Sequence, residues 1–278
     1  MEAPVKVRQV KQDMPFKTNH PQNKIYFYRF VGGNPSETEK LVKELDQQKG
    51  KHELLIGIFR FPFRFEGKKR TEIASIQYFR MKELCDAVIV FRSDDLLKMV
   101  DEKTPIHEAY QTFRKIEDYT ILSLQKTIDL TGEINIDFQD VVTFIKRNPG
   151  PMFIHTVEGS YFNEPLKYLI SSPYLPDDFT DGKQLIINIG YTRSADLDAF
   201  RQINLRLNDL FSKADIFKIG SYLIDEPGEK FRITLLVNGI DDPVKMPEDY
   251  KKLPKYRGIS RMFGKITNNR QLARLFKN

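Results

Sequence analysis

The sequence has one cysteine in 278 residues, so it cannot form an internal disulfide or a thiolate metal cage. Its four histidines are scattered without the spacing of metal ligands. No apolar run approaches the roughly 18 residues needed to span a bilayer, and the first residues, MEAPVKVRQVKQDM, lack the apolar stretch of a secretory signal. We therefore expect a cytoplasmic protein without a metal site, in which Cys85 is a packing residue.

The composition is that of a globular chain, with 40% hydrophobic and 29% charged residues. The formal net charge is +6 and the pI about 9.1, which permits anionic partners but is modest for this length. The length allows two modest domains or one large one.

Strand-like and helix-like segments alternate through the first part of the chain. The apolar pattern predicts strands at 24–31, 53–59 and 86–91, and helices from Ser36 to Leu45 and over 68–84. Ser36 and Glu39 have the spacing of a capping box. This βαβαβ order is typical of a parallel sheet with crossover helices.

One long helix is predicted from Thr104 to about Leu130, which at 1.5 Å per residue is about 40 Å. Strands and helices alternate again after it, and the last two strands, 214–225 and 230–240, flank a turn at Glu226-Pro227-Gly228. This pattern predicts an α/β layer with a mixed sheet. From Pro243 onward the chain loses the strand rhythm and becomes basic.

The segment between the long helix and the second part of the chain is rich in polar side chains. In TGEINIDFQDVVTF, residues 131–144, Ile134, Ile136 and Phe138 alternate with polar residues, and helical spacing begins after Asp137. Asp137 as N-cap with Asp140 three residues later would satisfy the first amides of a helix. That interpretation explains two acids and leaves Asn135 without a role.

Several stretches taken together resemble FtsZ, the bacterial member of the tubulin family. They are PFRFEGKKR, DAVIVFRSDDLLKMVDEKTPIHEAY, INIDFQDVVTFI, LISSPYL, IINIGY and ITLLVNGI. The resemblance runs from about residue 25 to 240. It implies an α/β fold: a Rossmann-like nucleotide-domain remnant with a parallel sheet, a long central helix, and a second α/β domain with a mixed sheet.

The domain bounds expected from this resemblance follow the predicted elements. They are a polar leader at 1–23, a truncated nucleotide-domain remnant at 24–103, the central helix and following loop at 104–136, a C-terminal domain at 137–242, and a basic tail at 243–278.

The nucleotide half is expected to be incomplete. FtsZ-like proteins carry their first strands and phosphate loops before the segment at which this resemblance starts, and VGGNPSET stands where the family has its glycine-rich signature. Gly32 and Gly33 could offer amides to phosphate, but Pro35 has none. We interpret this loop as a helix start rather than a nucleotide site.

Three further positions match family residues that face the nucleotide. Glu66 and Arg70 correspond to residues near the ribose and phosphates, and Tyr110 to the ring against guanine. Where the family accepts from guanine, this chain has Arg114, which has donors only. The alternative interpretations are a surface ion pair for Glu66 and Arg70, and a helix core position for Tyr110; we favour them.

The resemblance also assigns a role to the loop. In FtsZ and tubulin the N-x-D-x-x-D loop projects into the nucleotide face of the next subunit, where its carboxylates orient water for attack on the γ-phosphate. Asn135, Asp137 and Asp140 match that motif. They are thus implied to act on a neighbouring subunit's nucleotide.

These observations lead to three hypotheses. The first is a nucleotide-free, FtsZ-like pseudo-GTPase that interacts through its loop with FtsZ or another tubulin-type filament, regulating filament dynamics or cell division, including at the division site. The second is a divergent, self-polymerising GTPase that binds GTP. The third is an FtsZ-like scaffold whose basic residues 255–278 bind an anionic membrane or nucleic acid.

Overall fold

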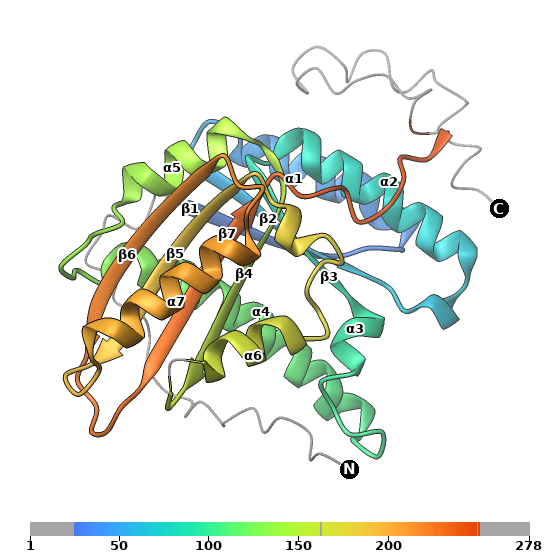
Figure 1. The fold of residues 1–278 in the computed structure, drawn as a ribbon. Helices are drawn as coiled ribbons and strands as arrows, with labels where there is room; N and C mark the ends of the chain where they lie inside the picture. Colours follow the sequence, from blue (N-terminus) through green and yellow to red (C-terminus); the bar gives the residue numbers. More distant parts are fainter. Residues whose placement is uncertain (1–24, 162, 249, 251–278) are drawn as a thin grey trace.

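The computed structural model describes residues 25–161, 163–248 and 250, which form a seven-stranded sheet with helices on both faces (Figure 1). The strands are β1 (Ile25–Val31), β2 (Leu54–Phe61), β3 (Ala87–Arg92), β4 (Gly150–Gly159), β5 (Gln184–Thr192), β6 (Ile216–Ile224) and β7 (Phe231–Asn238). The α-helices are α1 (Thr38–Gln48), α2 (Lys68–Leu84), α3 (Ser93–Leu97), α4 (Ile106–Asp129), α5 (Phe138–Arg147), α6 (Glu164–Ser171) and α7 (Leu197–Leu210). The predicted leader at 1–23 and most of the tail lie outside the described residues.

The first three strands form the parallel sheet that their alternation with helices predicts. β1 pairs with β2 and β2 with β3, both in parallel, in the order β1-β2-β3. The crossover helices α1 and α2 connect them on one face. The predicted helix over 68–84 is confirmed, and its end at Leu84 lets Cys85 pack in the same core as the buried side chains of α2. Burial raises the pKa of the Cys85 thiol, in keeping with a packing residue.

The second half of the sheet is mixed, as predicted, but its strand order differs from the sequence pattern. β4 extends the parallel part, β7 runs antiparallel between β4 and β5, and β6 pairs in parallel with β5. The last two strands are therefore separated by β5 and do not pair around the Glu226–Gly228 turn. β7 is buried along nearly its whole length whereas β6 is largely half-buried, so the more apolar strand takes the central position.

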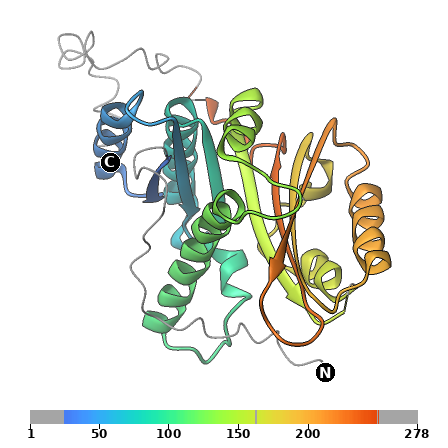
Figure 2. The same cartoon turned by 90° about the vertical axis from the view of Figure 1, so that its left-hand side faces the viewer.

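Helices α1, α2, α6 and α7 cover one face of the sheet, and α4 and α5 cover the other. Along β2, Leu55 and Phe59 face the α2 side, whereas Ile56 and Ile58 belong to the core shared with α4 and α5. That second core also includes residues of β4, β5 and β7, so it extends under both halves of the sheet. In Figure 2 α4 crosses in front of the sheet where its two groups of strands meet.

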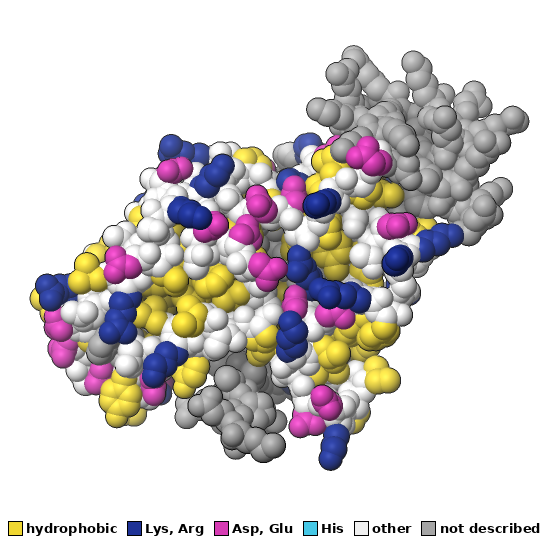
Figure 3. Space-filling model, turned by 45° about the vertical axis from the view of Figure 1, so that its right-hand side comes forward, with side chains coloured by type: hydrophobic (Ala, Val, Ile, Leu, Met, Phe, Trp, Pro, Cys, Tyr) yellow, Lys and Arg dark blue, Asp and Glu magenta, His cyan; other side chains and the backbone are white. Residues whose placement is uncertain are grey.

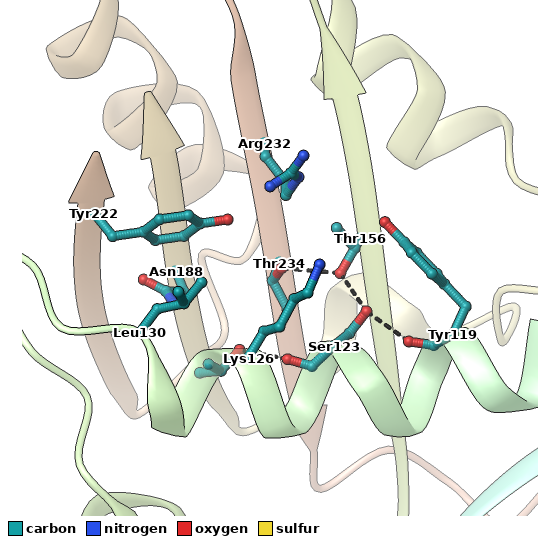
Figure 4. A pocket seen from close by; sticks show the side chains of 10 residues that line it. Tyr119, Ser123, Lys126, Leu130, Thr156, Asn188, Tyr222, Arg232 and Thr234 are labelled. Atoms are coloured by element: carbon teal, nitrogen blue, oxygen red, sulfur yellow. Dashed lines mark hydrogen bonds between the residues drawn. The ribbon is translucent and has the colours of Figure 1, made fainter. Parts of the chain in front are cut away.

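α4 confirms the predicted long helix, with 24 residues between Ile106 and Asp129. Part of its contact with the sheet is polar (Figure 4): Thr156 on β4 donates to Ser123 on α4 at 2.8 Å and lies 2.9 Å from the hydroxyl of Thr234 on β7. A cavity of about 10 Å³ beside them has room for one water. Lys126 lines this cavity, where burial and the nearby charge of Arg232 lower its pKa.

No helix in the described part of the chain is long and apolar enough to cross a membrane.

A buried imidazole joins β4 to the segment after α6. The His155 side chain lies 2.7 Å from the Ser172 hydroxyl through Nε2 and 2.8 Å from the Tyr174 hydroxyl through Nδ1. Burial lowers its pKa to about 4, because a charged imidazole would lose its hydration there. Protonation of His155 therefore opposes folding.

This linkage predicts how stability changes with pH. Between about pH 6.5 and pH 4 the unfolded chain binds a proton at His155 and the folded chain does not, so the free energy of unfolding falls as the pH is lowered through this window. We expect His155→Gln to reduce the slope by up to about 1.4 kcal/mol per pH unit. Urea unfolding at half-unit pH steps measures it.

The matched control is His107→Gln, since His107 is exposed on α4. Equal slopes in the two variants would contradict a special role for the buried imidazole.

Candidate functional site

The turn after β1 carries two of the predicted nucleotide contacts, Gly32 and Gly33. Gly32 N donates to the carbonyl of Arg60 at 2.9 Å, and Gly33 N donates to Gln77 Oε1 at 2.7 Å. Gln77 is fully buried on α2, and its amide nitrogen also donates to the Asn34 carbonyl and the Thr38 hydroxyl. The buried side-chain amide of Gln77 therefore stabilises the turn by accepting from Gly33 N and donating to the Asn34 carbonyl.

The following residues continue this internal pairing. Asn34 Oδ1 accepts from Ser36 N at 3.2 Å and from the Ser36 hydroxyl at 2.8 Å, and Glu37 N donates to the Asn34 carbonyl. Asn34 is the N-cap of a short 3-10 helix over Pro35–Glu37, which leads into α1. The predicted Ser36–Glu39 capping box is wrong, because Asn34 starts the helical segment two residues earlier and α1 itself has no side-chain cap.

Arg70 covers the glycine turn. Gly33 has φ of 110°, and a Cβ there would lie 2.5 Å from Arg70 Cγ, so both conformation and space require glycine. Arg70 Nε pairs with Glu66 Oε2 at 3.0 Å, and Glu66 Oε1 accepts from Phe63 N at 2.8 Å. The structure thus brings Gly33, Glu66 and Arg70 together: Glu66 and Arg70 form an ion pair, and Arg70 lies over the turn at Gly33.

Tyr110 joins this group through aromatic contacts. Its ring is 44% exposed and packs edge-on against Phe63 and Phe113, at 6.3 and 5.8 Å between centroids. The guanidinium of Arg60 lies 5.8 Å from the centroids of both Tyr110 and Phe113. Tyr110 is therefore half helix surface and half core.

Beside Tyr110 is an open cavity of about 410 Å³ between α4 and the ends of β1 and β2. Its charged lining is Arg29, Arg60, Arg114 and Glu117. Arg60 Nη1 lies 3.2 Å from Glu117 Oε1 in a buried ion pair, and Arg29 pairs with Asp118 outside the lining. Burial raises the pKa of Glu117 even though Arg60 opposes this shift.

Sequence reasoning missed Arg29 and Arg60, although each is a basic residue inside an otherwise apolar strand pattern, which is an available signal. Their pairing with Asp118 and Glu117 could not be predicted from the sequence, because it depends on where α4 crosses the strands.

Two features of the described residues oppose binding of a guanine nucleotide in the manner that the resemblance implies. The Gly32 and Gly33 amides, which a phosphate would need, already have protein acceptors, and Arg114 offers no acceptor to a guanine base. In the described part of the chain, no group of three His, Cys, Asp or Glu side chains is arranged to hold a metal ion.

The loop residues Asn135, Asp137 and Asp140 lie after the other end of α4. Asp137 is the N-cap of α5: its carboxylate accepts from Asp140 N at 2.8 Å, and Asp140 accepts from Asp137 N at 3.0 Å. The predicted cap is confirmed, with the second acid completing a capping box. Burial alone would raise the pKa of Asp140, but its bonds to Lys218 on β6 and to Asp137 N outweigh burial and lower it.

Asn135 also has a local partner. Its Oδ1 accepts from Gly132 N at 2.7 Å, which closes the turn after α4. Ser221 N on β6 donates to the Ile134 carbonyl at 2.8 Å, so the loop is fixed to the sheet. Asn135 and Asp137 remain exposed, and the loop therefore presents an amide and a carboxylate to solvent on a braced backbone.

The two groups of residues lie at opposite ends of α4. Tyr110 and Arg114 are in its N-terminal half, whereas Asn135 lies beyond its C-terminal end, and the 15 residues from Arg114 to Asp129 span about 22 Å. The loop cannot reach the Arg-lined cavity of its own chain. A chemical role for Asn135 and Asp137 at such a cavity would need a second molecule.

The chain has the FtsZ/tubulin-like α/β fold, as comparison with solved structures shows. No model of a known protein family matches the sequence. Among solved structures, the empty FtsZ dimer of M. jannaschii is similar with a TM-score of 0.62 at 19% identity, covering 83% of this chain and 78% of that one.

Two further structures have the same fold. A GTPγS-bound protofilament of CetZ2 from Haloferax volcanii has a TM-score of 0.65 at 14% identity, covering 84% of this chain and 70% of that chain. GDP-form protofilaments of TubZ from Bacillus thuringiensis serovar israelensis give 0.59 at 12% identity, covering 82% and 63%.

Removing the Gln77 amide should destabilise the glycine turn. Gln77→Leu leaves Gly33 N without its acceptor and removes one of the two donors to the Asn34 carbonyl, so we expect the free energy of unfolding to fall by about 1–3 kcal/mol. Gln139→Leu, on the exposed surface of α5, is the matched control and should change it by less than about 0.5 kcal/mol. Denaturant unfolding measures both, and similar losses would contradict the role of Gln77.

The capping role of Asp137 can be separated from its charge. Asp137→Ala should cost about 1 kcal/mol of stability, because Asp140 N loses its acceptor. Asp137→Ser keeps an N-cap acceptor and should lose only a few tenths of that. If thermal unfolding shows equal losses for both variants, the hydrogen bond is not what stabilises this helix start.

Proposed function

We propose that this chain is an FtsZ-like subunit that works without a nucleotide of its own and presents residues 131–140 to the nucleotide face of FtsZ or another tubulin-type filament. One observation carries the proposal. The Gly32 and Gly33 amides are satisfied within the chain, whereas Asn135 and Asp137 are exposed on a braced loop at the other end of α4. The described residues thus retain the groups that would act on a neighbour, whereas the turn at Gly32 and Gly33 offers no free amide to a phosphate.

The similar structures support association between subunits of this fold. The proteins in them are described as an FtsZ dimer and as protofilaments of CetZ2 and TubZ, which are assemblies of one kind of subunit. A loop at one end and a cavity at the other give a subunit different surfaces at its two ends, which suits head-to-tail association. The proposed role is regulation of filament dynamics in bacterial cell division, by a pseudo-GTPase located where the filament is.

The presented groups set the chemistry of the contact. Asn135 and Asp137 offer an amide and a carboxylate that could orient water at a neighbour's phosphate, in the manner of general base catalysis. Asp140 already pairs with Lys218 and accepts from Asp137 N at the start of α5. We therefore assign it the role of holding the loop in place, not of contacting the neighbour's nucleotide.

The deciding experiment measures phosphate release and pelleting with GTP for this protein alone, its cognate FtsZ alone, and a mixture. We expect a change of twofold or more only in the mixture: higher release means stimulation by the loop, and lower release means capping of a growing end. Release by this protein alone would overturn the nucleotide-free proposal.

Asp137→Ser supplies the matched variant, because it keeps the helix cap and removes the carboxylate. We expect it to abolish the effect in the mixture, while Asp209→Ser, the same change at an exposed position on α7, leaves it intact. An effect that survives Asp137→Ser would show that the loop is not the contact.

The second candidate, a self-polymerising GTPase, is favoured by the 410 Å³ cavity beside Tyr110. Saturable GTP binding by the isolated chain would replace the first proposal with this one.

The third candidate, membrane or nucleic-acid binding through 255–278, concerns a segment outside the described residues. On the face seen in Figure 3, acidic and basic side chains are interspersed, without a single-sign patch among the coloured residues.

A further inference from the structure

β1 is an open edge of the sheet. It stands at one end of the strand order and pairs only with β2. Among the residues that the structure describes, no strand or loop forms backbone hydrogen bonds with its outer side. β6, at the other end of the order, differs, because Ser221 pairs with Ile134.

The backbone groups that face outward follow from one hydrogen bond. Gly32 N, just after β1, donates to Arg60 on β2, so by strand alternation Tyr26, Tyr28 and Phe30 point their N–H and C=O groups toward β2. The alternate residues Ile25, Phe27, Arg29 and Val31 therefore direct theirs outward. Within the described part of the chain, no backbone group pairs with the outward donor and acceptor of these residues.

The edge lacks the usual protection against pairing. IYFYRFV is seven residues long, with no proline or glycine and one charged side chain, Arg29. Natural sheets protect exposed edges with proline, lysine, bulges or a short strand. A long aromatic edge without these devices is suited to pairing with another strand.

We propose that β1 pairs antiparallel with β1 of a second copy of this chain, with Tyr28 of the two copies face to face on the twofold axis. This register uses all seven residues and places Arg29 opposite the ring of Phe27. Centring the pair on Arg29 would oppose two guanidinium groups, and centring it on Phe27 would leave strand residues unpaired. Outward residues then meet as hydrogen-bonded pairs, and Tyr26 meets Phe30 as an aromatic pair.

A twofold pairing covers both open edges at once, which a head-to-tail contact cannot do. It extends each sheet into the other and does not use the 131–140 loop, although Arg29, Phe30 and Val31 of β1 also line the cavity beside Tyr110. The proposal therefore goes beyond the proposed function, and either can fail without the other.

Site-directed disulfide formation tests the register. In a non-hydrogen-bonded antiparallel pair the Cα atoms are about 4.5 Å apart, within disulfide range. Tyr28→Cys should give a covalent dimer as the main species on a non-reducing gel after mild oxidation. Cys85 is buried and gives little background.

Val31→Cys is the matched control on the same strand, and it should remain monomeric. In this register residue 31 faces residue 25, so the two cysteines would lie about 20 Å apart along the ladder. Equal cross-linking of the two variants would indicate random collision and overturn the proposal.

A second measurement avoids reliance on one variant, since Tyr28 also bonds to Glu44 and its loss could disturb folding. Tyr26→Cys and Phe30→Cys should each stay monomeric alone and cross-link when mixed. If the mixture does not cross-link and the unmodified chain is monomeric by light scattering at the same concentration, the edge is not a self-pairing surface. A monomer whose β1 amides resist hydrogen exchange would indicate another occupant and equally overturn the proposal.

Discussion

The pairing between β3 and β4 is the constraint on which the architecture depends. It joins the two halves of the sheet through three residue pairs, and one of them includes Pro151, which has no N–H to donate. So short a connection is stabilised by what lies beneath it: one apolar core that includes residues of β2, β3, α4, α5, β4 and β7. Because α4 packs in this core, its two ends, and the groups attached to them, are held at a set separation.

The charged residues at those ends have different surroundings. Beside the first half of α4, as far as its middle, Arg60 and Glu117 are buried together and Arg29 is paired with Asp118, so most of the charge is used within the chain. After its end, Asp140 is paired with Lys218, but Asp137 uses its carboxylate only for the helix cap and remains exposed. A helix cap requires a hydrogen-bond acceptor but does not require a charge. Asp137 can therefore cap α5 while its charge remains available to a partner.

The two proposed contacts use different groups of the molecule. The ends of α4 differ from each other and suit head-to-tail contact, whereas the β1 edge is one surface that can meet its own copy across a twofold axis. The first depends on side-chain chemistry at a loop and the second on backbone groups left unpaired by the strand order. The first proposed contact would act along a filament, and the second would join the sheets of two chains.

Local sequence pattern was enough to determine the elements: the α2 bounds, the length of α4 and the Asp137 cap are all short-range consequences of apolar spacing and capping. Tertiary structure decided what spacing cannot carry. Gln77 closes the Gly32-Gly33 turn from 44 residues away, Arg60 meets Glu117 across α4, and β5 separates β6 from β7. These depend on which segments share a core, and periodicity within one segment contains no information about its partner.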